Sequence, residues 1–143
     1  MDHEDERTER GIRLASEMLG SAFGDKMRDH IGNGGFASAI ARHGMTHSYT
    51  DCWSRDGLER KERSLVTIAA LIGMRQPNEL RNHIKIGVAN GLTVREIEEI
   101  LVQLSTYVGY PCIASATTAT IEALREIGMA PDSARTSEER GVL

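Results

Sequence analysis

The apolar residues of this chain recur at steps of three and four along nearly its whole length, and no segment alternates between apolar and polar residues. Ile12, Ala15, Leu19 and Phe23 mark a first stripe of this kind. Such spacing is typical of one face of an amphipathic α-helix, whereas a half-buried strand needs a period of two. The sequence therefore predicts an all-α protein, a compact helical domain of about six helices.

Start and stop signals divide the second half of the chain. A helix over residues 58–73 is expected to end near Gly73, and Pro77 suits the first turn of the next helix. That helix ends at Asn90-Gly91, and Thr93 with Glu96 forms a capping box that starts another. Two further helical stretches cover about residues 36–49 and 113–127.

Size and charge limit the class of protein. A chain of 143 residues with 40% apolar residues is expected to form a single domain over residues 1–143, with a core at about 9–128 and a poorly ordered tail at 131–143. Its net charge of −4 is spread along the chain, so neither nucleic acid nor a membrane surface is an expected partner. No apolar stretch is long enough to span a membrane and the N-terminus is charged, which predicts a cytoplasmic protein.

The two cysteines, Cys52 and Cys112, are too far apart for a CxxC motif or for the ligand spacing of a zinc site. Cys112 follows Pro111 at an expected helix N-terminus, where a helix dipole lowers the pKa of a thiol. Both a buried structural thiol and a reactive one fit this position.

Two histidines and an aspartate recur every four residues, at His43, His47 and Asp51. On a continuous helix they share one face, where they could hold a metal, contact a substrate or be solvated. The segment lacks the glutamate of the HExxH motif, so it does not indicate a zinc protease. We expect no metal, and substrate contact and solvation both remain open.

His83 shares a helix face with Leu80 and Gly87, on the side expected to face the core. A histidine there could act as a general acid or base, or it could be a buried side chain bound to a backbone carbonyl. Glu79, one turn earlier, could orient the ring or only complement the helix N-terminus.

Two other groups could bind an organic acid. Arg63 follows Arg60 and Lys61 near the start of a helix, where a guanidinium can clamp a carboxylate; a solvated basic turn is the simpler interpretation. Tyr107 and Tyr110 flank an interhelical corner, where their hydroxyls could donate to an oxyanion or their rings could simply pack.

Several of these motifs occur together in a fixed order along the chain. They read WSRDGL at 53–58, RSLVT at 63–67, ELRNH at 79–83, NGLT at 90–93 and YVGYP at 107–111. In order and spacing, over about residues 9–127, the chain resembles the carboxymuconolactone decarboxylase family. The resemblance implies an all-α domain that assembles into a homotrimer or homohexamer.

The same superfamily has a redox branch, similar to alkylhydroperoxidase D, that carries CxxC three residues before a histidine. Here Gln76 and Glu79 stand at the positions of those cysteines, and Ser64 stands where that branch has a glutamate. A peroxidase-like redox protein is therefore the weaker alternative, because disulfide chemistry needs the missing thiols. The chain is assigned to the decarboxylase branch.

The resemblance implies a cofactor-independent decarboxylase that removes CO2 from a small carboxylated lactone in aromatic-compound catabolism. In this hypothesis Arg63 binds a carboxylate, His83 delivers a proton and Glu79 orients His83. The residues expected to contact the substrate are His47, Asp51, Trp53, Ser64 and Tyr107.

The segment HSYTD at 47–51 departs from the family pattern, and Ala114 and Thr118 replace the family's usual asparagine and histidine. A lyase or isomerase acting on a different small organic acid is therefore an alternative. A helix-turn-helix regulator is disfavoured, because acidic residues outnumber basic ones over the two relevant helices.

Overall fold

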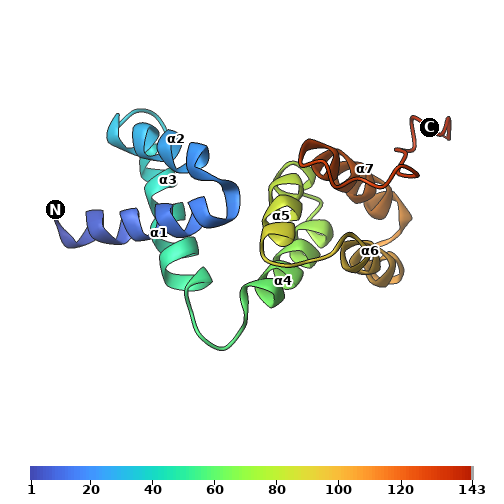
Figure 1. Ribbon diagram of the computed structural model, residues 1–143, viewed down its shortest axis with the longest axis horizontal. Coiled ribbons are helices and arrows are strands. Elements are labelled where there is room, and N and C mark those ends of the chain that lie inside the picture. The colour runs from blue at the N-terminus through green and yellow to red at the C-terminus, as the bar shows by residue number, and fades with distance from the viewer. Residues whose placement is uncertain (143) are drawn as a thin grey trace. The chain divides into compact units, whose positions relative to one another are not determined.

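The computed structural model describes residues 1–142, and this part of the chain contains seven α-helices, one π-helix and no strand. The predicted all-α class is confirmed. The helices form two compact units, Met1–Glu59 and Arg60–Leu143. The α-helices are labelled in Figure 1. The single domain expected from the sequence stays a prediction. Leu143, at the end of the expected tail, lies outside the described residues. None of the described helices is long and apolar enough to cross a membrane.

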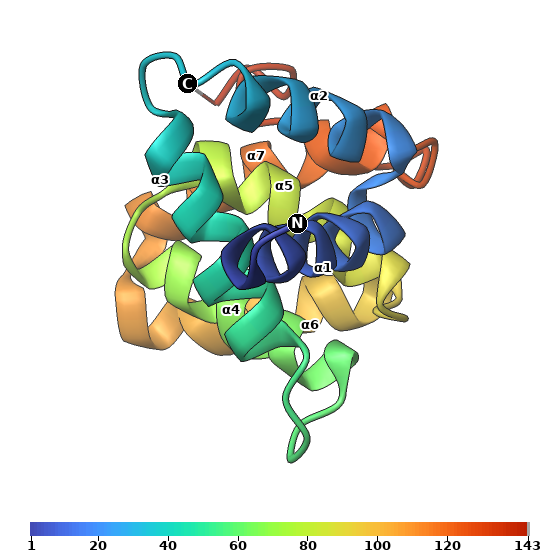
Figure 2. The same cartoon turned by 90° about the vertical axis from the view of Figure 1, so that its left-hand side faces the viewer.

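The first unit contains α1 (His3–Leu19), α2 (Ser21–Gly32), α3 (Ser38–His43) and the π-helix η1 (Gly44–Trp53). The stripe from Ile12 to Phe23 is divided between two helices, because Gly20 adopts a left-handed φ of 92° and ends α1. α1 crosses η1, as both cartoon views show (Figures 1 and 2). The buried core of this unit consists of Ile12, Ala15, Ile31 and Met45.

The second unit contains α4 (Arg60–Gly73), α5 (Pro77–Ala89), α6 (Val94–Val108) and α7 (Tyr110–Glu126). α5 packs against α4 and α7, and α6 also contacts both of these helices. Apolar side chains of these four helices meet in one core, which includes Ile68, Ile72, Leu80, Ile84, Ile97 and Leu124.

Most of the predicted helix ends of this unit are confirmed. Thr93 and Glu96 form the capping box at the start of α6, and Pro77 occupies the first turn of α5. α7 begins three residues earlier than residue 113, because Gly109 turns the chain with a φ of 88° and Pro111 fits the first helical turn.

The segment after α7 contacts the helix that precedes it. Both guanidinium Nη atoms of Arg125 lie 2.7 Å from the Glu139 carboxylate, and Thr136 is buried. The hydrogen bond from Arg125, followed by that from the Thr136 amide, lowers the pKa of Glu139 to about 2. This carboxylate therefore stays charged, and paired, through the physiological pH range.

Candidate active site

His83 lies in the middle of α5, and its imidazole is half-buried. Leu80 and Gly87, which share its helix face, are buried, as the sequence predicted. A Cβ atom added to Gly87 would lie only 3.1 Å from Cδ1 of Ile68, so this face of α5 is turned toward α4. The structure thus places the imidazole next to a packed helix surface.

Two opposing effects act on the pKa of His83. Burial is the larger effect and lowers the pKa below its usual 6.5, because a partly desolvated ring resists charging. The charge of Glu79, one turn earlier on α5, raises it in part. His83 is therefore mostly neutral at pH 7, and Glu79 tunes how readily it takes up a proton.

Two contacts fix how α4 and α5 lie against each other. Asn90 Nδ2 donates a hydrogen bond to Ser64 Oγ at 3.0 Å, and Gly87 abuts Ile68, so the two helices run antiparallel. In this register Arg63 lies level with the end of α5. His83 lies about two turns, or roughly 10 Å, further along the helix axis.

Arg63 is half-buried, and its Nε atom is shielded from solvent. Ser64, beside it, is fully buried, and its hydroxyl is bound by Asn90 within the helix interface. Ser64 thus fixes the start of α4 against the end of α5, which also positions Arg63. Its direct contact with a substrate stays a prediction.

Tyr107 occupies the last turn of α6, and its side chain is 75% exposed. Tyr110 is 74% exposed, at the start of α7. Neither ring is packed into the corner between the two helices, so the interpretation as aromatic packing is wrong. A role for the Tyr107 hydroxyl in substrate binding stays a prediction.

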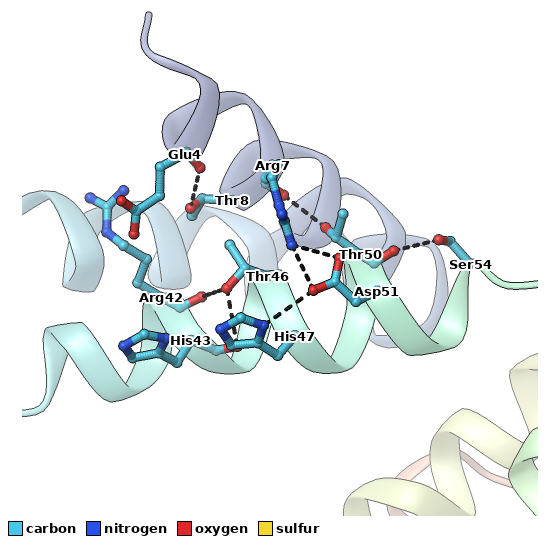
Figure 3. Close-up of polar contacts among 10 residues, drawn as sticks. All are labelled: Glu4, Arg7, Thr8, Arg42, His43, Thr46, His47, Thr50, Asp51 and Ser54. Carbon is cyan, nitrogen blue, oxygen red and sulfur yellow. Dashed lines mark hydrogen bonds and ion pairs between the residues drawn. The ribbon is translucent and has the colours of Figure 1, made fainter.

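In the first unit, an ion-pair group surrounds Asp51 (Figure 3). Arg7 Nη2 lies 2.6 Å from both carboxylate oxygens of Asp51, and His47 Nδ1 lies 3.1 Å from Oδ2. The His47 ring stacks on His43 with centroids 5.3 Å apart. The predicted sharing of one face is confirmed, although the helix here is π-helical.

This arrangement is not that of a metal site. Within residues 1–142, no three His, Cys, Asp or Glu side chains are grouped so that they could hold a metal ion. The imidazoles of His43 and His47 are stacked at an interplanar angle of 12°, and Asp51 is engaged by Arg7. Trp53, half-buried, stacks on Tyr49 at the end of η1. Substrate contact by His47, Asp51 and Trp53 stays a prediction.

The amino-acid sequence of this chain matches a known protein family. The model of the carboxymuconolactone decarboxylase family matches residues 39–122, which is more than half of the chain. The chain belongs to the carboxymuconolactone decarboxylase family.

Two decarboxylases are similar to this chain over most of their length. A 4-carboxymuconolactone decarboxylase of Acinetobacter baylyi is 31% identical over 132 residues, covering 91% of this chain and 96% of that protein. A nitrosuccinic acid decarboxylase of Metarhizium robertsii is 29% identical over 121 residues, covering 82% and 80%. Both relatives are decarboxylases, and the present member of the family is a carboxy-lyase.

Two residues of this family member were not singled out for the site by sequence reasoning. Asn90 was interpreted only as a helix stop, yet its side chain also holds Ser64. Arg7 lies 44 residues before Asp51, so no local pattern could link the two. Charge alone gives a weak signal for Arg7, because the N-terminal segment contains several other charged residues.

Proposed function

We propose that this decarboxylase acts on a small dicarboxylic acid, a carboxylated unsaturated lactone such as 4-carboxymuconolactone, in the breakdown of aromatic compounds. The observation that carries the proposal is the similarity to the Acinetobacter baylyi decarboxylase over 96% of that protein's length. Nitrosuccinic acid is the second candidate substrate, because the relative from Metarhizium robertsii decarboxylates it.

The two candidate substrates share a chemical pattern. In each, the carbon that carries one carboxylate is attached to a CH2–COO⁻ arm and to an electron acceptor, either an unsaturated lactone or a nitro group. When the C–CO2 bond breaks, its electron pair moves into that acceptor and gives a dienolate or a nitronate. A proton from the enzyme or solvent then adds to a carbon of this anion, which in the lactone is the carbon next to the carbonyl, so that the product is an enol-lactone. The substrate itself supplies the electron sink, so the reaction requires no cofactor.

Arg63 is the group that we assign to the retained carboxylate. A guanidinium binds a carboxylate through two parallel hydrogen bonds, and partial burial of Arg63 strengthens that interaction. The separation of about two helical turns between Arg63 and His83 suits a small dicarboxylate, with one end at Arg63 and its reacting carbon toward His83. The leaving carboxylate is then held away from the positive charge, which favours its departure as neutral CO2.

His83 is the group that we assign to proton delivery. Its lowered pKa makes the imidazolium a stronger acid than an exposed histidine, so it gives up its proton more readily to the developing carbanion. A dianionic substrate nearby favours protonation of the ring before the reaction. Glu79 is a positioning residue in this mechanism, because it acts through the pKa of His83.

The substrate assignment can be tested by incubating the protein with 4-carboxymuconolactone and measuring CO2 release. We expect one CO2 per substrate, with a turnover number of about 1–10³ s⁻¹. Muconolactone, which lacks the carboxylate on the ring, is the matched control and should release none. Turnover of nitrosuccinic acid without turnover of the lactone would transfer the proposal to the second candidate. Turnover of neither would refute both.

The role of Glu79 predicts a shift in the pH profile. If His83 donates a proton, kcat/KM falls as the pH rises through the pKa of His83, which lies below 6.5. Glu79→Gln removes the charge that raises this pKa, so the midpoint should move to lower pH. Measuring kcat/KM from about pH 5 to 8 checks the direction.

The matched control for this experiment is Glu98→Gln, which removes an exposed carboxylate from α6. Its profile should coincide with that of the wild type. A midpoint that stays in place in Glu79→Gln would show that Glu79 does not act on His83.

A further inference from the structure

Three helices of the second unit end in the same hydrogen-bonded turn. In this motif the amides of two residues beyond the helix bond back to carbonyls of its last turn, and the first of the two residues is left-handed. Glycine occupies that position after α5 and α7, as Gly91 with a φ of 99° and Gly128 with a φ of 69°. After α5, the backbone amides of Leu92 and Gly91 donate hydrogen bonds to the carbonyls of Gly87 and Val88. After α7, those of Met129 and Gly128 donate to the carbonyls of Leu124 and Arg125.

The turn after α4 has the same bonds but a different residue. The amide of Gln76 bonds to the carbonyl of Leu71 at 3.0 Å, and the amide of Arg75 bonds to that of Ile72 at 3.0 Å. Arg75 therefore stands where the other two turns have glycine, with a φ of 56°. An L residue incurs a steric cost there that glycine avoids. This turn therefore places a charged side chain at a position where the turns after α5 and α7 have no side chain.

Arg75 lies at a pocket between the end of α4, the start of α5 and the start of α7. The cavity has a volume of about 160 Å³. Buried or half-buried apolar side chains form much of its wall, including Leu71, Ile72, Leu80 and Ala116. An apolar cavity of about 150 Å³ accommodates a benzene ring. The pocket is therefore large enough for a small cyclic or branched apolar group.

The charge at this pocket is that of Arg75, since the other described lining residues are neutral. Gln76 and Ser115 add polar groups at its exposed edge. Among residues 1–142 the guanidinium of Arg75 has no ion-pair partner, whereas Arg81 and Arg125 of the same unit are paired with glutamates. The pocket thus combines an apolar interior with an available cation at its mouth.

We propose that this pocket is a binding site for a small organic monocarboxylate, whose apolar body enters the cavity and whose carboxylate binds the guanidinium of Arg75. The lining of the pocket includes none of the residues assigned to the decarboxylation. The inference is therefore independent of the proposed function. A ligand in this pocket would join α4, α5 and α7 at their common end, so its binding would stabilise the second unit.

Benzoate is a suitable probe, because it has a six-membered ring and a single carboxylate. Titration of the full chain should shift the backbone NMR signals of Ile72 and Ser115, with saturation in the millimolar range. Benzamide, which has the same shape without the charge, should bind at least about tenfold more weakly. Ser115→Phe, which fills the mouth while retaining Arg75, should abolish the shift of the Ile72 signal.

The decisive variant is Arg75→Gly, because the two roles of this position predict opposite effects. Benzoate binding should weaken by about tenfold or more, since the carboxylate loses its cation. The Tm of the free protein should instead rise by roughly 2–4 °C, because glycine relieves the left-handed strain. Arg75→Asn, which also tolerates a left-handed φ, provides a second variant for the binding measurement.

The matched control is Gly128→Arg, which places an arginine at the same position of the turn after α7. A side chain added there meets open space, so only the backbone cost is expected. Its Tm should fall, and its affinity for benzoate should equal that of the wild type. Equal affinity in wild type, Arg75→Gly and Arg75→Asn would overturn the proposal, as would the absence of wild-type binding at tens of millimolar benzoate.

Discussion

Replacing His83 by glutamine is expected to lower kcat on the substrate by about 10²- to 10⁴-fold, the usual contribution of a general acid. Glutamine keeps the approximate size and polarity of the half-buried ring, so α5 should remain packed against α4. The loss therefore reflects the missing proton donor rather than a collapsed helix. Steady-state kinetics at pH 6, with the circular dichroism spectrum as a test of folding, provide the measurement.

The control for this variant is His30→Gln, which changes an exposed histidine at the end of α2 and should retain full activity. A His83→Gln protein with wild-type kcat and a normal spectrum would remove His83 from the mechanism. A rise in KM with an unchanged kcat would instead indicate that His83 binds the substrate and does not deliver a proton.

Stability gives an independent readout of the same side chain. Because the pKa of His83 is lowered in the folded protein, the unfolded chain binds more protons at pH values between that pKa and about 6.5. The free energy of unfolding should therefore decrease as the pH falls through this interval. His83→Gln should remove this part of the pH dependence, whether or not the residue is catalytic.

The parts of the fold that follow from local chemistry were predictable from the sequence. Pro77 and the pair Thr93 and Glu96 mark helix starts through backbone donors that only nearby residues can satisfy. The end of α1 at Gly20 was missed, because the apolar spacing continues from Ile12 to Phe23 on both sides of the break. The spacing of apolar residues indicates which residues are buried. It does not show where one helix ends when the next helix continues the same spacing.

Other features depend on packing that no local pattern encodes. The left-handed turn after α4 was missed because Arg75 stands at a position that usually contains glycine. In the candidate site, the spacing of His83 with Leu80 and Gly87 predicted a partly buried ring. The hydrogen bond between Asn90 and Ser64 could not be predicted, because it depends on the register between α4 and α5.

Gly11→Ala adds a single methyl group and is expected to destabilise the first unit strongly. Gly11 is buried in α1 where this helix crosses η1. A Cβ atom there would lie 2.0 Å from the carbonyl oxygen of Met45 and 2.9 Å from Oγ1 of Thr50. Real Cβ atoms do not approach a backbone oxygen so closely, so α1 would have to move away from η1.

That movement disrupts several interactions at once. Thr50 Oγ1 donates to the carbonyl of Arg7 at 2.7 Å, and Arg7 also holds Asp51. Met45 and Ile12, both buried where the two helices meet, would be partly exposed. Overpacking in a core costs about 1–3 kcal/mol and more where backbone must shift. We therefore expect about 3 kcal/mol or more for Gly11→Ala, and a fall in Tm of roughly 10 °C.

Thermal unfolding followed by circular dichroism, with limited proteolysis of residues 1–59, measures this effect. Gly32→Ala is the matched control, because a methyl group added at the end of α2 meets no atom within 4 Å. It should leave the Tm unchanged or raise it slightly, since alanine has less conformational freedom than glycine in the unfolded chain. Of these two glycines, only Gly11 lies where α1 contacts η1. Equal Tm values for the two variants would therefore mean that the backbones of α1 and η1 are not in close contact at this point.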